Sequence, residues 1–550
     1  MRRILSIFNR KQTTIGSAAF ILMIMVFTSR MLGLVRDRML TRYFIPDELG
    51  VYFAAFRLPN LLFELLVMGA LTTAFIPVFT RYITKNKKDD AHVMASTVIN
   101  IALLALGVLL IPLLIWTEQI SMIIAPGFTA SQISQMVLYT RILLIFQVIP
   151  LMIGNFFTGI LQSYKLFLIP AIAPVIYNAG VVVCIALFAS SIGLFAPVLG
   201  VVVGAVLFML IQLPLLHHVR YRHKFSTHPK TKGVREVITL MIPRTFGLAV
   251  AQIDTTVDIM LASMLGARMV TIFHFAQHLQ HLPVGLFGAT IAQAALPSLS
   301  QDSTHKDTSK FKEKIITSVH QIMFFVLPIS ALFIILRIPI VRIVFGSSQF
   351  DWDATVLTSI TLACFSVSLF AQSISHVFIR GFYALYDSKT PVFIGVLTIL
   401  TNTFLSIMFI KFYKLPVWSL GLSTTVASII NVTFLYILLD RRIGTFSRVK
   451  LFVPIIKMII ATSITSVMLY IPLKLMDQLV FDTTRTFPLL MLTGFTSGIG
   501  LSTYFFLSWV FGVGEVYSFI HLMRRVRRAG VILLEPEREV INGGIQDKIS

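Results

Sequence analysis

Charged side chains lie inside long apolar runs, at spacings that place them on common helix faces. In the run 16–42, Arg30, Gly33 and Asp37 are three and seven residues apart and share a face, with Arg36 roughly a third of a turn away. Arginine forks bind phosphate groups in a bidentate manner. This face could therefore hold an anion. The alternative is an Arg–Asp pair within one helix, near the membrane surface.

A second polar group follows the same spacing. Arg57, Asn60 and Glu64 share a predicted helix face, and Pro59 interrupts that helix because it lacks a backbone donor. A bent helix with polar residues at its break is typical of a cavity lining. Glu64 could instead neutralise an arginine.

Carboxylates occupy a third apolar run, 236–265. Asp254 and Asp258 are one helical turn apart, and Arg244 lies nearer the start of the run. The two carboxylates could bind a cation or a proton, or they could pair with arginines from the other half of the chain. Both interpretations stay open.

Three histidines at i, i+4 and i+7 follow in the run 270–299: His274, His278 and His281. Zinc is conceivable, but no carboxylate or cysteine completes a ligand set nearby. We therefore favour a polar cavity lining.

Composition identifies the elements that position these groups. Hydrophobic types make up 56% of the 550 residues and charged types 13%, about half the roughly 25% of soluble domains. This excludes a soluble enzyme, a disordered chain and a coiled coil. Spanning helices need about 20 apolar residues each. The sequence therefore predicts an all-α polytopic membrane protein.

Apolar runs of spanning length number fourteen. They lie near 16–42, 51–81, 93–116, 134–161, 168–189, 193–217, 236–265, 270–299, 315–346, 354–384, 391–412, 417–439, 450–473 and 487–512.

Lysine and arginine concentrate in alternate links between these runs. The link 218–235 carries six of them, whereas 117–133, 190–193 and 347–353 carry none. The positive-inside rule then places both termini in the cytoplasm and explains the net charge of +22 without nucleic acid. The outer links are too short for a catalytic domain, so we do not expect an enzyme. Residues 516–528 form a basic amphipathic pattern that should lie on the inner leaflet.

A weak internal repeat divides the chain. Arg30 to Gly33 resembles Arg244 to Gly247, and the stretch ending at Pro77 resembles the stretch ending at Pro297. We predict two pseudo-symmetric six-helix lobes, as in many transporters. The predicted parts are an N-lobe at 1–220, a C-lobe at 221–445, two extra helices forming a lipid-tail groove at 446–513, and a cytoplasmic amphipathic helix and tail at 514–550.

At these residues the chain resembles the MurJ (MviN) family of lipid II flippases, in the multidrug/oligosaccharidyl-lipid/polysaccharide exporter superfamily. The matching motifs run from one end of the chain to the other: Thr28-Ser-Arg-Met-Leu-Gly-Leu-Val-Arg-Asp37, Ala55-Phe-Arg-Leu-Pro-Asn-Leu-Leu62, Gly69-Ala-Leu-Thr-Thr-Ala-Phe-Ile-Pro77, Ala125-Pro-Gly-Phe128, Pro243-Arg-Thr-Phe-Gly-Leu248, Leu282-Pro-Val-Gly-Leu-Phe-Gly288 and Phe382-Tyr-Ala-Leu-Tyr-Asp-Ser-Lys-Thr-Pro391.

The resemblance implies fourteen helices in the bacterial plasma (inner) membrane. It implies transport of the undecaprenyl-pyrophosphate-linked peptidoglycan precursor, lipid II, from inner to outer leaflet by alternating access, for cell-wall synthesis. Arg30 and Arg36 match essential cavity residues of the family, and the aspartate matching Asp37 orients them. The expected partners are the precursor and membrane lipids, with no nucleic acid, and we expect a monomer.

Two departures from the family pattern stand out. Phe63 stands where an arginine often follows the Pro-Asn of the second helix, and His278 stands where the eighth helix usually has arginine. Arg57 and Arg244 could compensate. No cofactor is implied beyond a coupling cation. In some members sodium binds between helices seven, eleven and twelve, so Asp254, Asp258 and Asn402 form a candidate sodium site, although Ser406 replaces a carboxylate. The coupling ion stays open between sodium and a proton.

Two other classes of function compete with this interpretation. An exporter of another polyprenyl-linked glycan, or of drugs, would share the fold, but a drug exporter favours an acidic, aromatic cavity. A membrane glycosyltransferase needs catalytic carboxylates at a membrane face, usually on a long outer loop. The sequence predicts no such loop.

Overall fold

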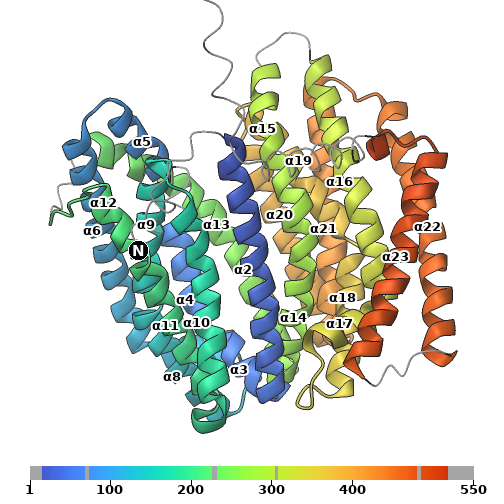
Figure 1. Cartoon of the computed structure of the whole chain (residues 1–550), viewed down its shortest axis with the longest axis horizontal. Helices are drawn as coiled ribbons and strands as arrows, with labels where there is room; N and C mark the ends of the chain where they lie inside the picture. Colours follow the sequence, from blue (N-terminus) through green and yellow to red (C-terminus); the bar gives the residue numbers. More distant parts are fainter. Residues whose placement is uncertain are drawn as a thin grey trace, which may run out of the picture. The chain divides into compact units, whose positions relative to one another are not determined.

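The computed structural model describes residues 15–68, 74–225, 232–303, 308–479, 485–517 and 519, and within these ranges it forms helices and no strands (Figure 1). This confirms the all-α class. Each apolar run coincides with one helix or with several in series. In chain order they are α2 (Ile15–Tyr43), α3 (Pro46–Ala55), α4 (Arg57–Phe63), η1 (Glu64–Met68), α5 (Ile76–Thr84), α6 (Lys88–Ile115), α7 (Thr117–Ile124), α8 (Ala130–Phe146), α9 (Val148–Ser163), α10 (Leu168–Ile192), α11 (Phe195–Leu210), α12 (Leu213–His218), α13 (Lys232–Met264), α14 (Ala267–Pro283), η3 (Val284–Ala289), α15 (Thr290–Asp302), α16 (Ser309–Ile335), α17 (Arg337–Phe345), α18 (Trp352–Ser366), α19 (Leu369–Ala384), α20 (Lys389–Ile407), η4 (Met408–Phe412), α21 (Trp418–Ile443), α22 (Arg448–Leu479) and α23 (Thr486–Val510).

The chain is a multi-pass membrane protein. In the described part, 11 helical stretches are long and apolar enough to cross a membrane, or 12 when the bent pair α18 and α19 counts as one span. Helices α2 and α13 are not in this set. Some side chains of each of these two helices are outside the described part of the chain. Fourteen spans are compatible with this result, and that number stays a prediction. Most of the predicted amphipathic helix at 516–528 also lies outside the described residues.

The predicted break near Pro59 is present, and it falls one turn earlier, at Phe56 between α3 and α4. Proline lacks an N–H group, so the carbonyl four residues before it loses its helical partner. That carbonyl belongs to Ala55, and it accepts a hydrogen bond from the Thr140 hydroxyl of α8 at 3.1 Å. The bend is therefore stabilised by a neighbouring helix.

A π-helical turn occurs in the second apolar run and again in the eighth. The π-helical turn η1 follows α4, and the π-helical turn η3 follows α14 just after Pro283. Both lie in the runs that end in the repeated motif at Pro77 and Pro297. Local π-helix widens the helix and often occurs at functional positions.

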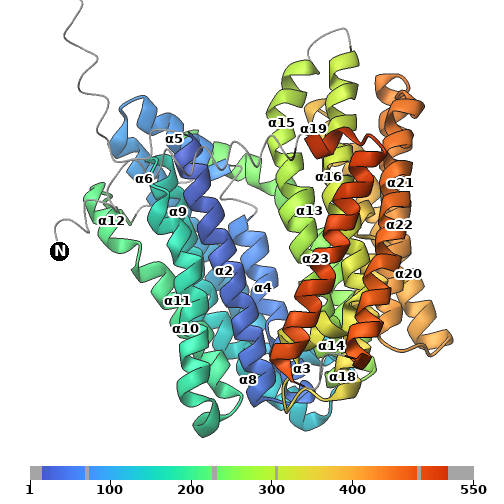
Figure 2. The same ribbon diagram turned by 45° about the vertical axis from the view of Figure 1, so that its right-hand side comes forward.

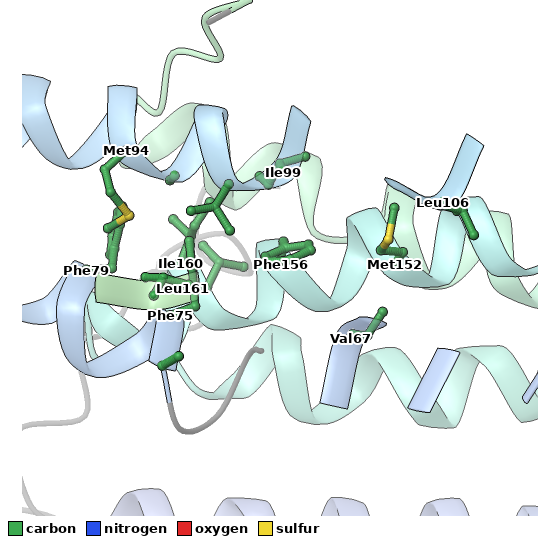
Figure 3. Packing of buried hydrophobic residues seen from close by; sticks show 14 of the residues in the cluster. Val67, Phe75, Phe79, Met94, Ile99, Leu106, Met152, Phe156, Ile160 and Leu161 are labelled. Carbon is green, nitrogen blue, oxygen red and sulfur yellow. The ribbon is translucent and has the colours of Figure 1, made fainter. Parts of the chain in front are cut away.

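The described residues group into two compact units. The first comprises 1–282, 337–368 and 387–434. Within it, α10 packs along α2 and α11 (Figure 2). Helix α13 packs on α20, α6 and α7. Its apolar core lies between α5, α6 and α9. Phe75 stacks on Phe79 with ring centres 5.6 Å apart and meets Phe156 edge-on at 5.4 Å (Figure 3). This core includes Leu58 and Leu62 of α4, the helix that carries the predicted site residues Arg57 and Asn60.

The second unit comprises 283–336, 369–386 and 435–550. Within it, α22 packs along α23, and α16 packs on α22 and α19. The Lys457 ammonium on α22 donates to the Phe511 carbonyl at 2.7 Å, so this lysine has a polar partner inside its own unit.

One end of the first unit is closed by contacts between residues of the predicted N-lobe and C-lobe. A Cβ at Gly50 would lie 1.9 Å from the Ala267 carbonyl oxygen, so only glycine permits this approach. The Thr271 hydroxyl donates to the Pro46 carbonyl at 2.6 Å, and Arg38 Nη1 donates to the Ile343 carbonyl at 2.6 Å.

Candidate functional site

Arg36 and Asp37 form a tight ion pair although they are neighbours in the chain. Adjacent helical side chains normally point apart. Here the Arg36 side chain turns back, and Nε and Nη2 donate to Asp37 Oδ1 at 2.9 and 2.8 Å. Asp37 is fully buried, whereas 22% of the Arg36 side chain stays exposed. The carboxylate is thus enclosed, and the guanidinium remains accessible.

Asn178 holds Arg36 from a second direction. Its Oδ1 accepts from Arg36 Nη1 at 3.4 Å, and its Nδ2 donates to Ser29 Oγ at 3.1 Å and to the Pro174 carbonyl at 3.2 Å. This asparagine on α10 did not appear among the predicted site residues. Its signal in the sequence was a bifunctional amide inside the apolar run 168–189.

His278 completes the cluster from α14. Its Nδ1 lies 2.7 Å from Asp37 Oδ2, and an ionised carboxylate can only accept, so the ring donates. The His278 side chain keeps 30% of its surface exposed. His274 instead stacks on Phe53 at 3.9 Å, and His281 is exposed. No group of three or more His, Cys, Asp or Glu side chains that could hold a metal ion occurs among the described residues, and the histidine row forms none.

Arg30 lies one turn and a half before the cluster on α2, where it is half-buried. A Cβ added at Gly33, between Arg30 and Asp37, would meet no atom within 4 Å. Room for a ligand atom therefore remains on the face that the i, i+3, i+7 pattern predicted.

Arg57 points at the backbone of α13. Its Nε donates to Thr256 Oγ1 at 2.8 Å and its Nη2 donates to the Gln252 carbonyl. The side chain is buried, so it ties α4 to α13. Asn60, one turn later, is exposed. The backbone of Arg244 lies in α13, but its side chain lies outside the described residues, so its predicted role has no structural description.

Asp254, Asp258 and Asn402 come together in the same compact unit. Asn402 Nδ2 donates to Asp254 Oδ1 at 3.0 Å and to Asp258 Oδ1 at 3.3 Å. The amide oxygen of Asn402 is buried and has no hydrogen-bond partner. Two carboxylates that share one site repel each other, and hard cations prefer oxygen ligands. The residues present therefore fit a small hard cation. Ser406 Oγ lies 2.6 Å from Ser423 Oγ beside them.

Comparisons with known proteins place the chain in a family. The sequence profile described as lipid II flippase MurJ matches residues 47–489. The chain belongs to the MurJ family. A probable lipid II flippase MurJ of Borreliella burgdorferi is 26% identical over 451 residues, covering 80% of this chain and 87% of the relative. The one of Bdellovibrio bacteriovorus is 27% identical over 504 residues, covering 91% and 95%.

Solved structures agree with the fold of this MurJ family member. A lipid II flippase MurJ in an inward closed conformation matches with a TM-score of 0.73 and 24% identity, over 90% of this chain and 98% of that one. An inward-facing multidrug resistance MATE transporter of the MOP superfamily matches with a TM-score of 0.65 and 12% identity, over 76% and 94%. At these identities the likeness concerns the fold alone.

The link between the predicted lobes of this MurJ family member docks on α6 through a polar stripe that sequence reasoning did not single out. The Tyr221 hydroxyl oxygen lies 3.3 Å from His223 Nδ1 and 3.0 Å from Ser96 Oγ, within hydrogen-bond distance of both. His223 Nε2 donates to Asn100 Oδ1 at 3.0 Å, and the Lys224 amide donates to Ser96 Oγ at 3.0 Å. Burial raises the pKa of Tyr221 to about 12 and lowers the pKa of His223.

Proposed function

We propose that this protein flips lipid II from the inner to the outer leaflet by alternating access, and so supplies precursor for cell-wall synthesis. Membership of the MurJ family across residues 47–489 is the observation that carries this proposal. The cluster on α2 and α14 adds chemical support, because it presents two partly exposed hydrogen-bond donors, the Arg36 guanidinium and the His278 ring, over a buried carboxylate. A pyrophosphate-linked lipid has the matching negative charge.

In this proposal Arg36 and His278 bind the pyrophosphate, and Asp37 holds both side chains in position. Side chains that are already held in place lose little conformational entropy when an anion binds. The hydrogen bonds from Arg36 and His278 to Asp37 therefore favour anion binding. Arg30 adds a further positive charge on the open face near Gly33. Arg57, Asn60 and Arg244 are assigned to substrate binding from sequence alone. Since both described Arg57 hydrogen bonds go to α13, we propose that it contributes by placing that helix.

The proposed transport cycle uses the two predicted lobes, 1–220 and 221–445, with 446–513 as a groove for the lipid tail and 514–550 as a cytoplasmic helix and tail. The contacts of Gly50 and Thr271 support a state in which the outer end is closed. Reopening that end after the inner end closes would complete the exchange between leaflets.

Asp254, Asp258 and Asn402 are proposed to hold a coupling cation, with sodium as the first candidate and a proton as the second. A bound cation would relieve the repulsion between the carboxylates, and the unpartnered amide oxygen of Asn402 could turn toward it. Movement of the cation down its electrochemical gradient would supply free energy to the transport cycle. We propose no covalent chemistry for the protein. We further propose a monomer in the bacterial inner membrane, with both termini in the cytoplasm.

Complementation tests the proposed substrate. The full chain is expressed in a bacterium depleted of its own lipid II flippase, and outer-leaflet lipid II is measured with an impermeant probe. Restored growth with normal outer-leaflet lipid II is expected. A well-expressed protein that leaves the precursor on the inner leaflet would reject lipid II as the cargo.

Thiol labelling tests the proposed orientation. Cysteine replaces exposed Arg222, or exposed Ser191 near Gly193, in a chain whose two native cysteines are changed to alanine. In intact cells an impermeant reagent should label the second site and not the first. The reverse pattern would place the termini outside.

A further inference from the structure

A second cationic pocket lies away from the Arg36 cluster, at the other end of the first compact unit. Its volume is about 390 Å³, and it is lined by Arg81 and Tyr82 of α5, Lys85 and Lys87 of the following turn, and Glu236 of α13. These residues come from positions about 150 apart in the chain. The Lys/Arg bias assigns this end to the cytoplasmic side.

The turn that carries the two lysines is rigidly built. Asn86 has a positive φ of 57°, a conformation that asparagine tolerates better than most residues. The Asn86 amide donates to the Ile83 carbonyl at 3.0 Å and the Lys87 amide donates to the Tyr82 carbonyl at 3.1 Å. This is the Schellman pattern that ends a helix. The backbone satisfies its own carbonyls, which leaves the lysine side chains free for another partner.

The charges of the lining are unbalanced. Three cations face one carboxylate, and that carboxylate, Glu236, already pairs with Arg81. Within the described part of the chain, Lys85 and Lys87 have no ion pair or hydrogen bond from their side chains. The lining residues therefore carry a net charge of +2.

The side of the pocket formed by α13 depends on a close approach. A Cβ added at Gly233 would lie 3.0 Å from both Cε2 and the hydroxyl oxygen of Tyr82 and 3.1 Å from Met94 Cγ. Glycine thus lets the first turn of α13 pack against Tyr82, which brings Glu236 within reach of Arg81. The pocket is a product of packing between distant segments, and a lone charged loop would not form it.

We propose that this pocket binds a phosphate group at the inner membrane surface, through Lys85 and Lys87. Anionic headgroups are enriched on the cytoplasmic leaflet and attract clustered lysines. The inference does not depend on lipid II being the cargo.

Lipid retention tests this site on the full-length protein. The protein is reconstituted in vesicles of phosphatidylcholine and phosphatidylglycerol, extracted gently, and the retained lipids are counted by native mass spectrometry. Lys85→Gln/Lys87→Gln should lower retained phosphatidylglycerol by about fivefold per lysine removed. Lys85→Arg/Lys87→Arg should restore it. Unchanged retention in the glutamine variant would overturn the proposal.

The matched control is Lys312→Gln/Lys450→Gln, which removes two lysines of the second compact unit from links assigned to the same membrane side. It should retain phosphatidylglycerol like the parent, and an equal loss in this control would overturn the proposal. Inorganic phosphate distinguishes the sources of the ligand. Displacement of the lysine-dependent lipid by inorganic phosphate supports a site open to the free anion, and resistance to displacement supports a lipid headgroup.

Discussion

His278 and Arg36 hold opposite oxygens of the same buried carboxylate. His278 Nδ1 lies 2.7 Å from Asp37 Oδ2, while Asp37 Oδ1 accepts both hydrogen bonds from Arg36. The contact joins α14 to α2, across a separation of 241 residues and across the two predicted lobes. An anion that binds the exposed faces of Arg36 and His278 would therefore contact both lobes at once.

Arg36→Ala should insert normally and fail to flip lipid II. The substitution removes an accessible phosphate donor and leaves Asp37 buried with one cationic partner fewer. Losing one member of a buried charge pair costs about 2–5 kcal/mol, which is enough to abolish transport. Outer-leaflet lipid II and the amount of protein in the membrane are measured together.

The control for this prediction is Arg42→Ala, which removes an exposed arginine from the same helix and should transport normally. Normal flipping by a stably expressed Arg36→Ala protein would remove Arg36 from the mechanism.

His278→Arg should remain active, because arginine can still donate to Asp37 and to the substrate phosphate. His278→Leu should fail, since it leaves the substrate phosphate and Asp37 Oδ2 each one donor short. Flipping of lipid II in reconstituted vesicles measures both effects. If His278→Leu transports like the parent, the histidine only packs between helices.

Sodium should raise the melting temperature of the purified parent when it replaces choline at equal ionic strength. A ligand that binds the folded state stabilises it by mass action. Asp258→Asn should remove this response because it takes away one carboxylate of the candidate site. Asp302→Asn is the matched control, since Asp302 is a buried carboxylate that pairs with Lys314 in the second compact unit. A sodium response that survives Asp258→Asn would place the cation elsewhere.

Acidification should release the link 221–225 from α6. Burial lowers the pKa of His223, so the docked form binds fewer protons than the released form. Docking is therefore complete above the ordinary histidine pKa of about 6.5 and weakens as the pH falls through and below it. Hydrogen exchange at the Lys224 amide, corrected for intrinsic rates, measures the release.

Two variants control this experiment. His223→Gln should abolish the pH dependence, and His218→Gln, at an exposed histidine just before the link, should preserve it. Protection of the Lys224 amide that does not change with pH in the parent would contradict the assignment.

Sequence periodicity was sufficient to predict the helices. It was also sufficient to predict two groups of polar residues that share a helix face. Apolar runs define helices because a spanning segment must satisfy its own backbone, whatever its neighbours are. The spacing of Arg30, Gly33 and Asp37 is likewise local, and so is the one-turn spacing of Asp254 and Asp258. These features follow from the geometry of one helix, and the structure preserves them.

Contacts between segments needed the tertiary structure. Asn178 and Ser29 are 149 residues apart, and nothing in either run indicates that one amide joins Ser29 and Arg36. Arg57 had the residue type of a substrate ligand, yet the packing of α13 against α4 engages it in hydrogen bonds to that helix. The pocket at Lys85 likewise exists because Gly233 lets α13 approach Tyr82.

The sequence by itself determined the helical class, which charged residues share a helix face, and the membership of the MurJ family. The tertiary structure decided which charges meet, that His278 rather than His274 binds Asp37, and which cations keep an exposed face. The physical reason is that helix formation and membrane insertion depend on residues within a few turns. Pairing of buried polar groups depends instead on how the helices pack, because a donor and an acceptor atom must come within about 3 Å of each other.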